Sequence, residues 1–289
     1  MTVHHQSDRS QQGTHAVKEF YEQKYSGAWH RLEIGESRFT KMWYRAFVQH
    51  CVPHLTLAGS RVLEVGCGAG LLGEYFSQQG ARYFGVDLAL NAVSQFPQSS
   101  PIRCFPVVAD ATMLPFPTGS FDLLLCMEVL EHTLEPGALL DECFRVIRPS
   151  GYLAFSTPNS LSLTFFPKML GDLGVPFFRR YVGRQIIDKW MTSFQLRRLL
   201  ALRGDVKLQR AVRLHPPFFE QLDFRLSQTN PLRRVNDFVF GLENRSGHRF
   251  PLNCVGQHTL CLVQAPTSSR KSVGAETTAH QREGSGALV

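Results

Sequence analysis

The chain has 289 residues, enough for one large domain or two small ones, and its 43% hydrophobic and 19% charged residues exclude a charge-rich disordered protein. Its net charge of +7 leaves nucleic acid, an anionic membrane surface and acidic ligands open as partners. Residues 1–15 lack the apolar run of a signal peptide, and no stretch reaches the roughly 18 apolar residues of a membrane span, so we expect a cytoplasmic protein. The seven cysteines, an odd number without a CxxC pair, indicate reduced thiols rather than disulfides or a zinc site.

The first half of the chain alternates short apolar runs with helix-length segments. A polar head, residues 1–15, is expected to be disordered, and residues 16–50 mix aromatic and charged residues as helices do. The apolar runs that follow are residues 62–65, 83–86, 105–108, 121–126 and 152–155. Strands that alternate with helices predict an α/β fold in which helices cover both faces of a doubly wound parallel sheet.

The second half is less regular. Residues 192–202 predict a helix that begins with Thr192 or Ser193 as its N-cap and stops at Gly204. Residues 206–214 and 257–263 predict two further strands, and residues 231–243 place five apolar side chains on one helical face. We expect a disordered tail over residues 266–289, and therefore one domain over residues 16–265.

A glycine-rich turn follows the first predicted strand. Glycines at positions 66, 68 and 70 let backbone N–H groups approach a ligand closely, where a side chain would obstruct it. The turn predicts a nucleotide-like cofactor. The dinucleotide fingerprint GxGxxG would need glycine where the chain has Leu71, and the phosphate loop GxxxxGK[ST] does not occur, which disfavours NAD and ATP.

Glu64-x-Gly66-x-Gly68-x-Gly70 resembles motif I of the class I S-adenosylmethionine-dependent methyltransferases. Asp87 ends the second strand, where this family uses an acidic side chain to accept both ribose hydroxyls, and Asp110 follows the third strand, where its Asp contacts the adenine amino group. Residues 117–132 and 145–151 resemble the fourth-strand motif and the turn into the fifth strand.

This resemblance, which falls within the methyltransferase type 11/12 superfamily, implies a Rossmann-like sheet of seven strands with the last strand antiparallel and a helical N-terminal cover. Residues 60–160 would be the cofactor-binding core, and residues 160–192 and 215–255 substrate-side lid insertions. It implies cofactor contacts at Glu64, Gly66, Cys67, Gly68, Gly70, Asp87, Leu88, Asp110, Ala111 and Met127. The helices around residues 21–45 would cover the cofactor, with Tyr25, Arg38 and Arg45 as contacts.

Glu128, Glu131 and His132 follow the fourth strand at i, i+3 and i+4, so on a helix they would project to one side. Two carboxylates and an imidazole suit Mg²⁺ or another divalent metal. The alternative is that these residues simply begin a helix, whose positive end favours carboxylates.

The same segment resembles the Glu-x-x-Glu-His of two subfamilies, the ubiquinone-biosynthesis O-methyltransferases and the RNA 3′-terminal 2′-O-methyltransferases. The RNA enzymes add a second His downstream of the fifth strand, where this chain has Lys189. That difference favours the first group. The chain also lacks the Asn- or Asp-Pro-Pro-aromatic motif that methyltransferases of amide or base amino nitrogens often carry here.

The positive charge lies in the substrate-side region. Residues 60–167 carry 5 basic and 10 acidic side chains, whereas residues 168–250 carry 16 and 7, with many Phe among the Arg. Aromatics interleaved with Arg suit a lid over a lipophilic acceptor that also contacts an anionic membrane surface, and they equally suit RNA. The density of Phe favours the lipophilic small molecule.

The sequence therefore predicts transfer of a methyl group from S-adenosylmethionine to a hydroxyl of an aromatic or lipophilic small molecule. His132 is the first candidate for the general base, or else a ligand of a metal that lowers the hydroxyl pKa, and His215 is the second candidate base. An RNA 2′-O-methyltransferase and a small-molecule N- or C-methyltransferase remain as alternatives.

Overall fold

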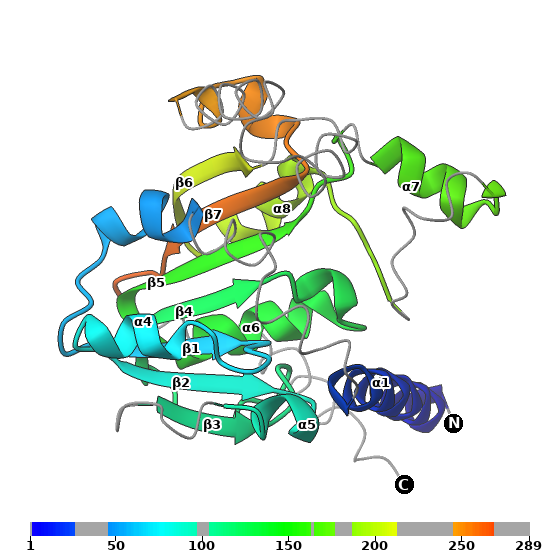
Figure 1. Cartoon of the computed structure of the whole chain (residues 1–289), viewed down its shortest axis with the longest axis horizontal. Helices are drawn as coiled ribbons and strands as arrows, with labels where there is room; N and C mark the ends of the chain where they lie inside the picture. Colours follow the sequence, from blue (N-terminus) through cyan, green and yellow to red (C-terminus); the bar gives the residue numbers. More distant parts are fainter. Residues whose placement is uncertain are drawn as a thin grey trace, which may run out of the picture.

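The computed structural model describes residues 2–26, 46–96, 104–162, 165–176, 187–212 and 245–268. Seven strands form one sheet in the order β3-β2-β1-β4-β5-β7-β6 (Figure 1). They are β1 Arg61–Val65, β2 Arg82–Asp87, β3 Cys104–Val108, β4 Phe121–Met127, β5 Ile147–Pro158, β6 Asp205–Val212 and β7 His258–Gln264. Each predicted strand is present, and β5 extends past its predicted range at both ends.

Strand direction follows the predicted fold class. Strands β1 to β5 pair in parallel, and β7 runs antiparallel to both of its neighbours, β5 and β6. The strand order reverses at β1, which lies between β2 and β4. In open α/β sheets a ligand binds at this reversal, outside the carboxyl ends of the strands.

The alternation of side chains along the strands builds two apolar layers, one on each face of the sheet. Leu63 and Leu124 pack on one face against α6 (Pro136–Val146) and α8 (Ser193–Ala201). Val62 and Leu125 pack on the other face, with Phe76 of α4 (Gly73–Gln78) and Phe47. The helices therefore cover both faces, as a doubly wound sheet requires.

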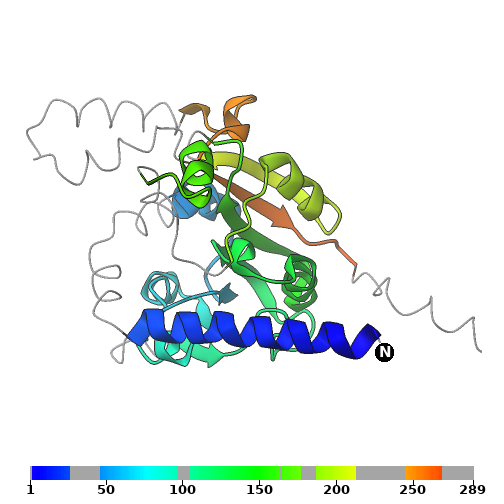
Figure 2. The same cartoon turned by 90° about the vertical axis from the view of Figure 1, so that its right-hand side faces the viewer.

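The helix α1 (Thr2–Ser26) corrects the expectation of a disordered head over residues 1–15, because residues 2–15 lie within it. It lies beyond the arrowheads of β1 and β2 in Figure 1 and crosses in front of them in Figure 2. The described chain also contains the single turn α5 (Leu90–Val93), the helix α7 (Phe165–Asp172) and a helical segment at residues 46–50. Every helix in the described part of the chain is too short or too polar to span a lipid bilayer.

The helix predicted over residues 192–202 is confirmed as α8. Thr192 is its N-cap, and the Thr192 side chain and Gln195 exchange hydrogen bonds with each other's backbone in a capping box. The predicted helix at residues 231–243 lies outside the described residues, as do His215, Arg38, Arg45 and the greater part of the predicted lids and tail.

Candidate functional site

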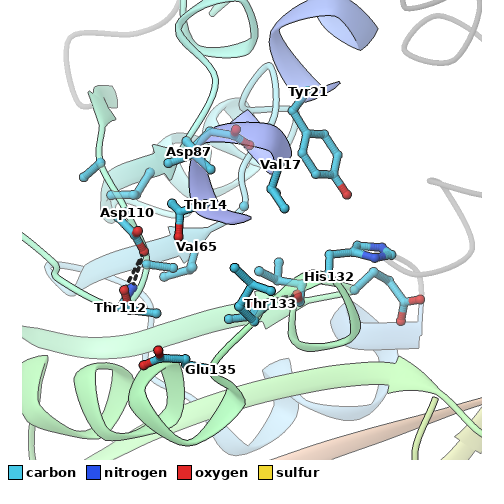
Figure 3. A pocket seen from close by; sticks show the side chains of 18 of the residues that line it. Thr14, Val17, Tyr21, Val65, Asp87, Asp110, Thr112, His132, Thr133 and Glu135 are labelled. Atoms are coloured by element: carbon cyan, nitrogen blue, oxygen red, sulfur yellow. Dashed lines mark hydrogen bonds between the residues drawn. The ribbon is translucent and has the colours of Figure 1, made fainter. Parts of the chain in front are cut away.

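A cavity of about 310 Å³ lies between α1 and the carboxyl ends of β1, β2 and β4. The wall that α1 provides consists of Thr14, Val17, Tyr21, Lys24 and Tyr25. Facing it are Val65, Gly66, Val86, Asp87, Leu88, Ala109, Asp110, Ala111 and Thr112, and one end is closed by Glu128, Val129, His132, Thr133, Leu134 and Glu135. Figure 3 shows Val17 and Tyr21 on one side of this space and Val65 and Asp110 on the other. The cavity therefore occupies the position where the reversal of strand order predicts a ligand.

The glycine turn forms part of the cavity floor. Gly66 and Gly70 both have φ +70°, a left-handed conformation that favours glycine. A Cβ at Gly66 would lie 2.4 Å from Cγ2 of Val129, and one at Gly70 would lie 2.3 Å from the Phe96 ring. Of the motif I residues predicted to touch the cofactor, only Gly66 lines the cavity, whereas Cys67, Gly68 and Gly70 shape the turn behind it.

Asp87 joins this turn to the loop after β2. Its Oδ2 accepts a hydrogen bond from the Gly68 N–H at 3.0 Å, and its Oδ1 accepts one from the Ala89 N–H at 2.9 Å. Burial raises the pKa of Asp87, although these backbone donors act against that shift. A carboxylate has about four lone-pair sites, more than these backbone donors use, so Asp87 can still accept a hydrogen bond from a ligand in the cavity.

Asp110 lies at the carboxyl end of β3 and also faces the cavity. Its Oδ1 accepts from both the backbone N–H and the side-chain hydroxyl of Thr112, at 2.8 and 2.7 Å (Figure 3). These two hydrogen bonds hold Oδ1 of Asp110 in place. The neighbouring Leu88 and Ala111 line the cavity as predicted.

Glu64 and Met127 are not among the residues that line the cavity. Glu64 is 3% exposed, and its carboxyl group accepts a hydrogen bond from the Tyr83 hydroxyl on β2. Burial raises the pKa of Glu64 to about 8, with the Tyr83 hydrogen bond opposing the shift. Glu64 therefore joins β1 to β2 next to the glycine turn.

The helix expected across residues 128–132 is wrong. Glu128 has a left-handed φ of +58°, and only Leu130–His132 form a single 3₁₀ turn. The Glu128 carboxylate points toward β5 and β7, where Oε1 accepts from Ser156 at 2.7 Å and Oε2 lies 2.8 Å from Nδ1 of His258. Burial raises its pKa, but His258 and Ser156 outweigh burial, so the pKa of Glu128 lies below its usual value.

Glu131 is buried on the opposite side of this turn. It is 1% exposed and accepts a hydrogen bond from the Thr157 hydroxyl at 3.2 Å, and burial together with the Glu128 charge raises its pKa well above the usual range. Within the described residues, no group of three or more His, Cys, Asp or Glu side chains is arranged to hold a metal. The donors Glu128, Glu131 and His132 thus do not fit the predicted metal site.

His132 faces the cavity with a defined orientation. Its Nδ1 lies 2.8 Å from the carbonyl oxygen of Ile187, and because a carbonyl only accepts, Nδ1 carries the proton. Burial lowers the pKa of His132, which keeps the ring neutral and leaves Nε2 as a proton acceptor. The Tyr21 ring of α1 lies 6.3 Å from the imidazole, centroid to centroid.

Sequence reasoning missed Thr14, Val17 and Ile187 as contributors to the site. It placed the cofactor cover from residue 21 onward, and Tyr25 does line the cavity, but Val17 and Thr14, one and two helical turns before Tyr21, line it as well. Their spacing on a helix was the available signal, although the surrounding residues are polar. Ile187 acts through a backbone carbonyl, so its residue type carries no signal.

Comparison with known proteins shows what the strand-rich core of this chain is similar to. Residues 63–155, from β1 to β5, match a family described as a methyltransferase domain. A ubiquinone biosynthesis O-methyltransferase from Pseudomonas fluorescens is 36% identical over 149 residues, which are 47% of this chain and 64% of that protein. One from Xanthomonas oryzae pv. oryzae is 39% identical over 134 residues, 45% of this chain and 55% of that protein. The chain thus spans less than two thirds of either relative.

Solved structures agree on the fold. A SAM-dependent methyltransferase from Methanosarcina mazei has a TM-score of 0.53 at 16% identity, covering 76% of this chain and 98% of that one. The magnesium protoporphyrin IX methyltransferase of Synechocystis PCC 6803, solved with bound SAH, has a TM-score of 0.51 at 20% identity, covering 69% and 94%. At such identities the likeness establishes the Rossmann-like methyltransferase fold.

The raised pKa of Glu64 predicts a pH-dependent stability. Its proton stabilises the fold fully below the unfolded value of 4.5, and this contribution is lost as the pH rises through about 8. Glu64→Gln, which stays neutral, should therefore raise the thermal midpoint by about 2–4 °C at pH 8.5 and change it little at pH 4.5. Scanning calorimetry at both pH values measures this. The exposed Glu74→Gln on α4 is the control, and an equal pH dependence in wild type and Glu64→Gln would contradict the assignment.

Proposed function

We infer from its methyltransferase domain, residues 63–155, that this chain transfers a methyl group from S-adenosylmethionine to a hydroxyl of an aromatic or lipophilic small molecule. The observation that carries this proposal is one cavity that joins the glycine turn and Asp87 to a neutral imidazole, His132. The names of the relatives, ubiquinone biosynthesis O-methyltransferases, support a hydroxyl acceptor of the quinol or catechol type.

The chain's own residues would hold the cofactor at the floor of the cavity. Asp87 lines the cavity and would accept hydrogen bonds from the ribose hydroxyls, and Asp110 lies at the neighbouring strand end, where the adenine amino group would be recognised. Gly66 allows the ligand to approach the backbone. When bound, S-adenosylmethionine supplies a methyl group on a positively charged sulfur.

His132 would then remove the proton from the acceptor hydroxyl. A phenol has a pKa of about 10, so an unassisted hydroxyl is almost entirely protonated at neutral pH. Nε2 of His132 is available to take that proton, because Nδ1–H is held by the carbonyl oxygen of Ile187. The product oxygen carries the methyl group, the proton stays on Nε2, and S-adenosylhomocysteine remains. The wall formed by α1 limits the water that could compete for Nε2.

No step of this proposal uses a metal. The Glu128 carboxylate is engaged by Ser156 and His258, and the Glu131 carboxylate by Thr157. An RNA 2′-O-methyltransferase of the metal-dependent kind is therefore less well supported than a small-molecule enzyme. A small-molecule N- or C-methyltransferase would use the same cofactor-binding residues. The two functions are therefore distinguished by whether the methyl group is found on oxygen, nitrogen or carbon of the product.

Mass spectrometry of the product tests the acceptor directly. We expect deuteriomethyl-labelled S-adenosylmethionine, incubated with the protein and a catechol that carries a short prenyl tail, to label one hydroxyl oxygen of the catechol. The same incubation with cell extract searches for other acceptors. Label found only on nitrogen, on carbon or on RNA would contradict the proposal.

Peripheral contact of the substrate-side region with an anionic membrane is part of the proposal. Lys168 is buried and binds Asp172 at 2.7 Å and Asp188 at 3.2 Å, which holds α7 against the segment that carries Ile187. Phe166 of α7 is 60% exposed, and Leu173, the residue that follows α7, is 73% exposed. Exposed aromatic and aliphatic side chains near a basic region suit insertion at a lipid surface.

Asp87→Ala should weaken the binding of S-adenosylhomocysteine about a hundredfold in calorimetry, because two hydroxyls lose a charged acceptor. Asp87→Asn, which preserves the shape of the side chain, should weaken it less. Asp141→Ala removes an exposed carboxylate that pairs with Arg203 on the surface and should bind as the wild type does. Unchanged affinity in a folded Asp87→Ala protein would contradict the ribose assignment.

His132→Ala should lower kcat about 10²- to 10⁴-fold and change the cofactor Kd little. Because burial lowers the pKa of His132, wild-type activity should persist below pH 6.5 and fall only as the pH drops through that lowered pKa. The pH profile of kcat/KM in both proteins measures this, with the exposed His54→Ala as control.

Two results would count against His132 as a base that works without metal. One is an acidic limb that remains unchanged in His132→Ala. The other is loss of wild-type turnover in EDTA with recovery in Mg²⁺, whereas we expect EDTA to have no effect.

Wild-type protein should co-sediment with vesicles that contain phosphatidylglycerol more than with pure phosphatidylcholine, and the double variant Phe166→Asp, Leu173→Asp should lose most of that binding. Phe194→Asp, which changes an exposed aromatic of α8, is the matched control. Equal sedimentation of all three proteins, or binding to short RNA instead, would contradict membrane contact by α7.

A further inference from the structure

The helix α1 forms one wall of the cavity, and this wall could move away from the rest of the site. Thr14, Val17, Tyr21 and Tyr25 lie on one face of α1 and line the cavity, whereas Lys18 and Glu19 between them are exposed. Because these side chains close one side of the site, displacement of α1 would open that side to a ligand.

The contacts that hold this wall are concentrated at Glu22. One carboxylate oxygen of Glu22 accepts the Leu90 N–H at 2.8 Å, and the other accepts the Asn91 N–H at 2.8 Å. The Asn91 side chain returns a hydrogen bond to the carbonyl oxygen of Glu22 at 2.9 Å, and Gln95 donates to the carbonyl oxygen of Tyr25 at 2.7 Å. A charged acceptor at these first N–H groups of α5 is favourable, since they have no partner within the helix.

These hydrogen bonds connect the wall to the floor. Leu90 and Asn91 follow Ala89 directly, and the Ala89 N–H donates to Asp87, whose other oxygen accepts from Gly68. At the same place, a Cβ on Gly68 would lie 3.1 Å from the Tyr25 hydroxyl. Only a few residues therefore separate the group proposed to bind ribose from the group that fixes α1.

We propose that Glu22 is the latch that holds α1 closed over the cofactor and thereby sets the rate at which S-adenosylhomocysteine leaves. This inference rests on the proposed function for the identity of the ligand. Glu22 would be a positioning residue, because both oxygens of its carboxylate accept hydrogen bonds from α5 and it is not among the residues that line the cavity. Loss of its two charge-assisted bonds should free α1 while the hydrogen bonds of Asp87 to Gly68 and Ala89 and that of His132 to Ile187 remain.

The test compares Glu22→Ala with Glu19→Ala, one turn earlier on the same helix, where the carboxylate is exposed and pairs only with His15 among the described residues. Stopped-flow dissociation of S-adenosylhomocysteine should be about tenfold faster in Glu22→Ala and unchanged in Glu19→Ala. Glu22→Gln should be intermediate, since an amide offers one acceptor oxygen. Hydrogen exchange of residues 13–26 in the ligand-free protein should speed up in the same order.

The outcomes separate the latch from the proposed function. If wild-type protein does not bind S-adenosylhomocysteine, the proposed function and the latch both fail. If wild type binds it and Glu22→Ala releases it at the wild-type rate, only the latch is overturned. Should Glu22→Ala not fold, Asn91→Ala removes the return bond to α1 and should give a smaller acceleration, and an unchanged rate in that variant would also overturn the latch.

Discussion

The carboxylate of Asp87 is the group on which the rest of the site depends. It lies half-buried at the carboxyl end of β2, and its two oxygens accept hydrogen bonds from backbone N–H groups of the glycine turn on one side and of the residue before α5 on the other. Partial removal of a carboxylate from water is costly unless it accepts several hydrogen bonds, and here the donors are the N–H groups whose positions define the cavity. The hydrogen bonds that stabilise the Asp87 carboxylate therefore position the turn after β1 and the turn after β2. Leu90 and Asn91, which follow directly, position α1 through their hydrogen bonds to Glu22.

The sequence predicted an element correctly wherever residues close together in the chain determine its structure. The strands follow apolar runs that every parallel sheet buries on both faces, and Thr192 with Gln195 specifies a capping box within four residues. Gly66 and Gly70 adopt a backbone conformation that other residues rarely accept, so their spacing alone indicated the turn. In these elements, the residues that form the sequence pattern are the same residues that form the structure, so the pattern was enough to predict it.

In other parts of the chain the local structure depends on contacts with residues that are distant in the sequence. A helical pattern across Glu128 to His132 looked reasonable, but Ser156 and His258 hold the Glu128 carboxylate against β5 and β7, and the Glu128 backbone is left-handed. The polar residues before Thr14 gave no reason to expect helix, and the hydrogen bonds that hold the other end of α1, at Glu22, come from α5, nearly seventy residues later. The proton position on His132 depends on the carbonyl oxygen of Ile187, which no side-chain pattern reveals.

The antiparallel pairing of β6 and β7 has an evolutionary consequence. Val212, the last residue of β6, pairs with His258, the first residue of β7, so the chain that leaves the sheet after β6 returns to the same place. A segment inserted there can change in length and composition without altering the register of any strand. His258 in turn contacts Glu128 at the edge of the cavity. Under the proposed function, selection for a new acceptor can therefore act on the chain between β6 and β7 while the residues that line the cavity from β1 to β4 stay unchanged.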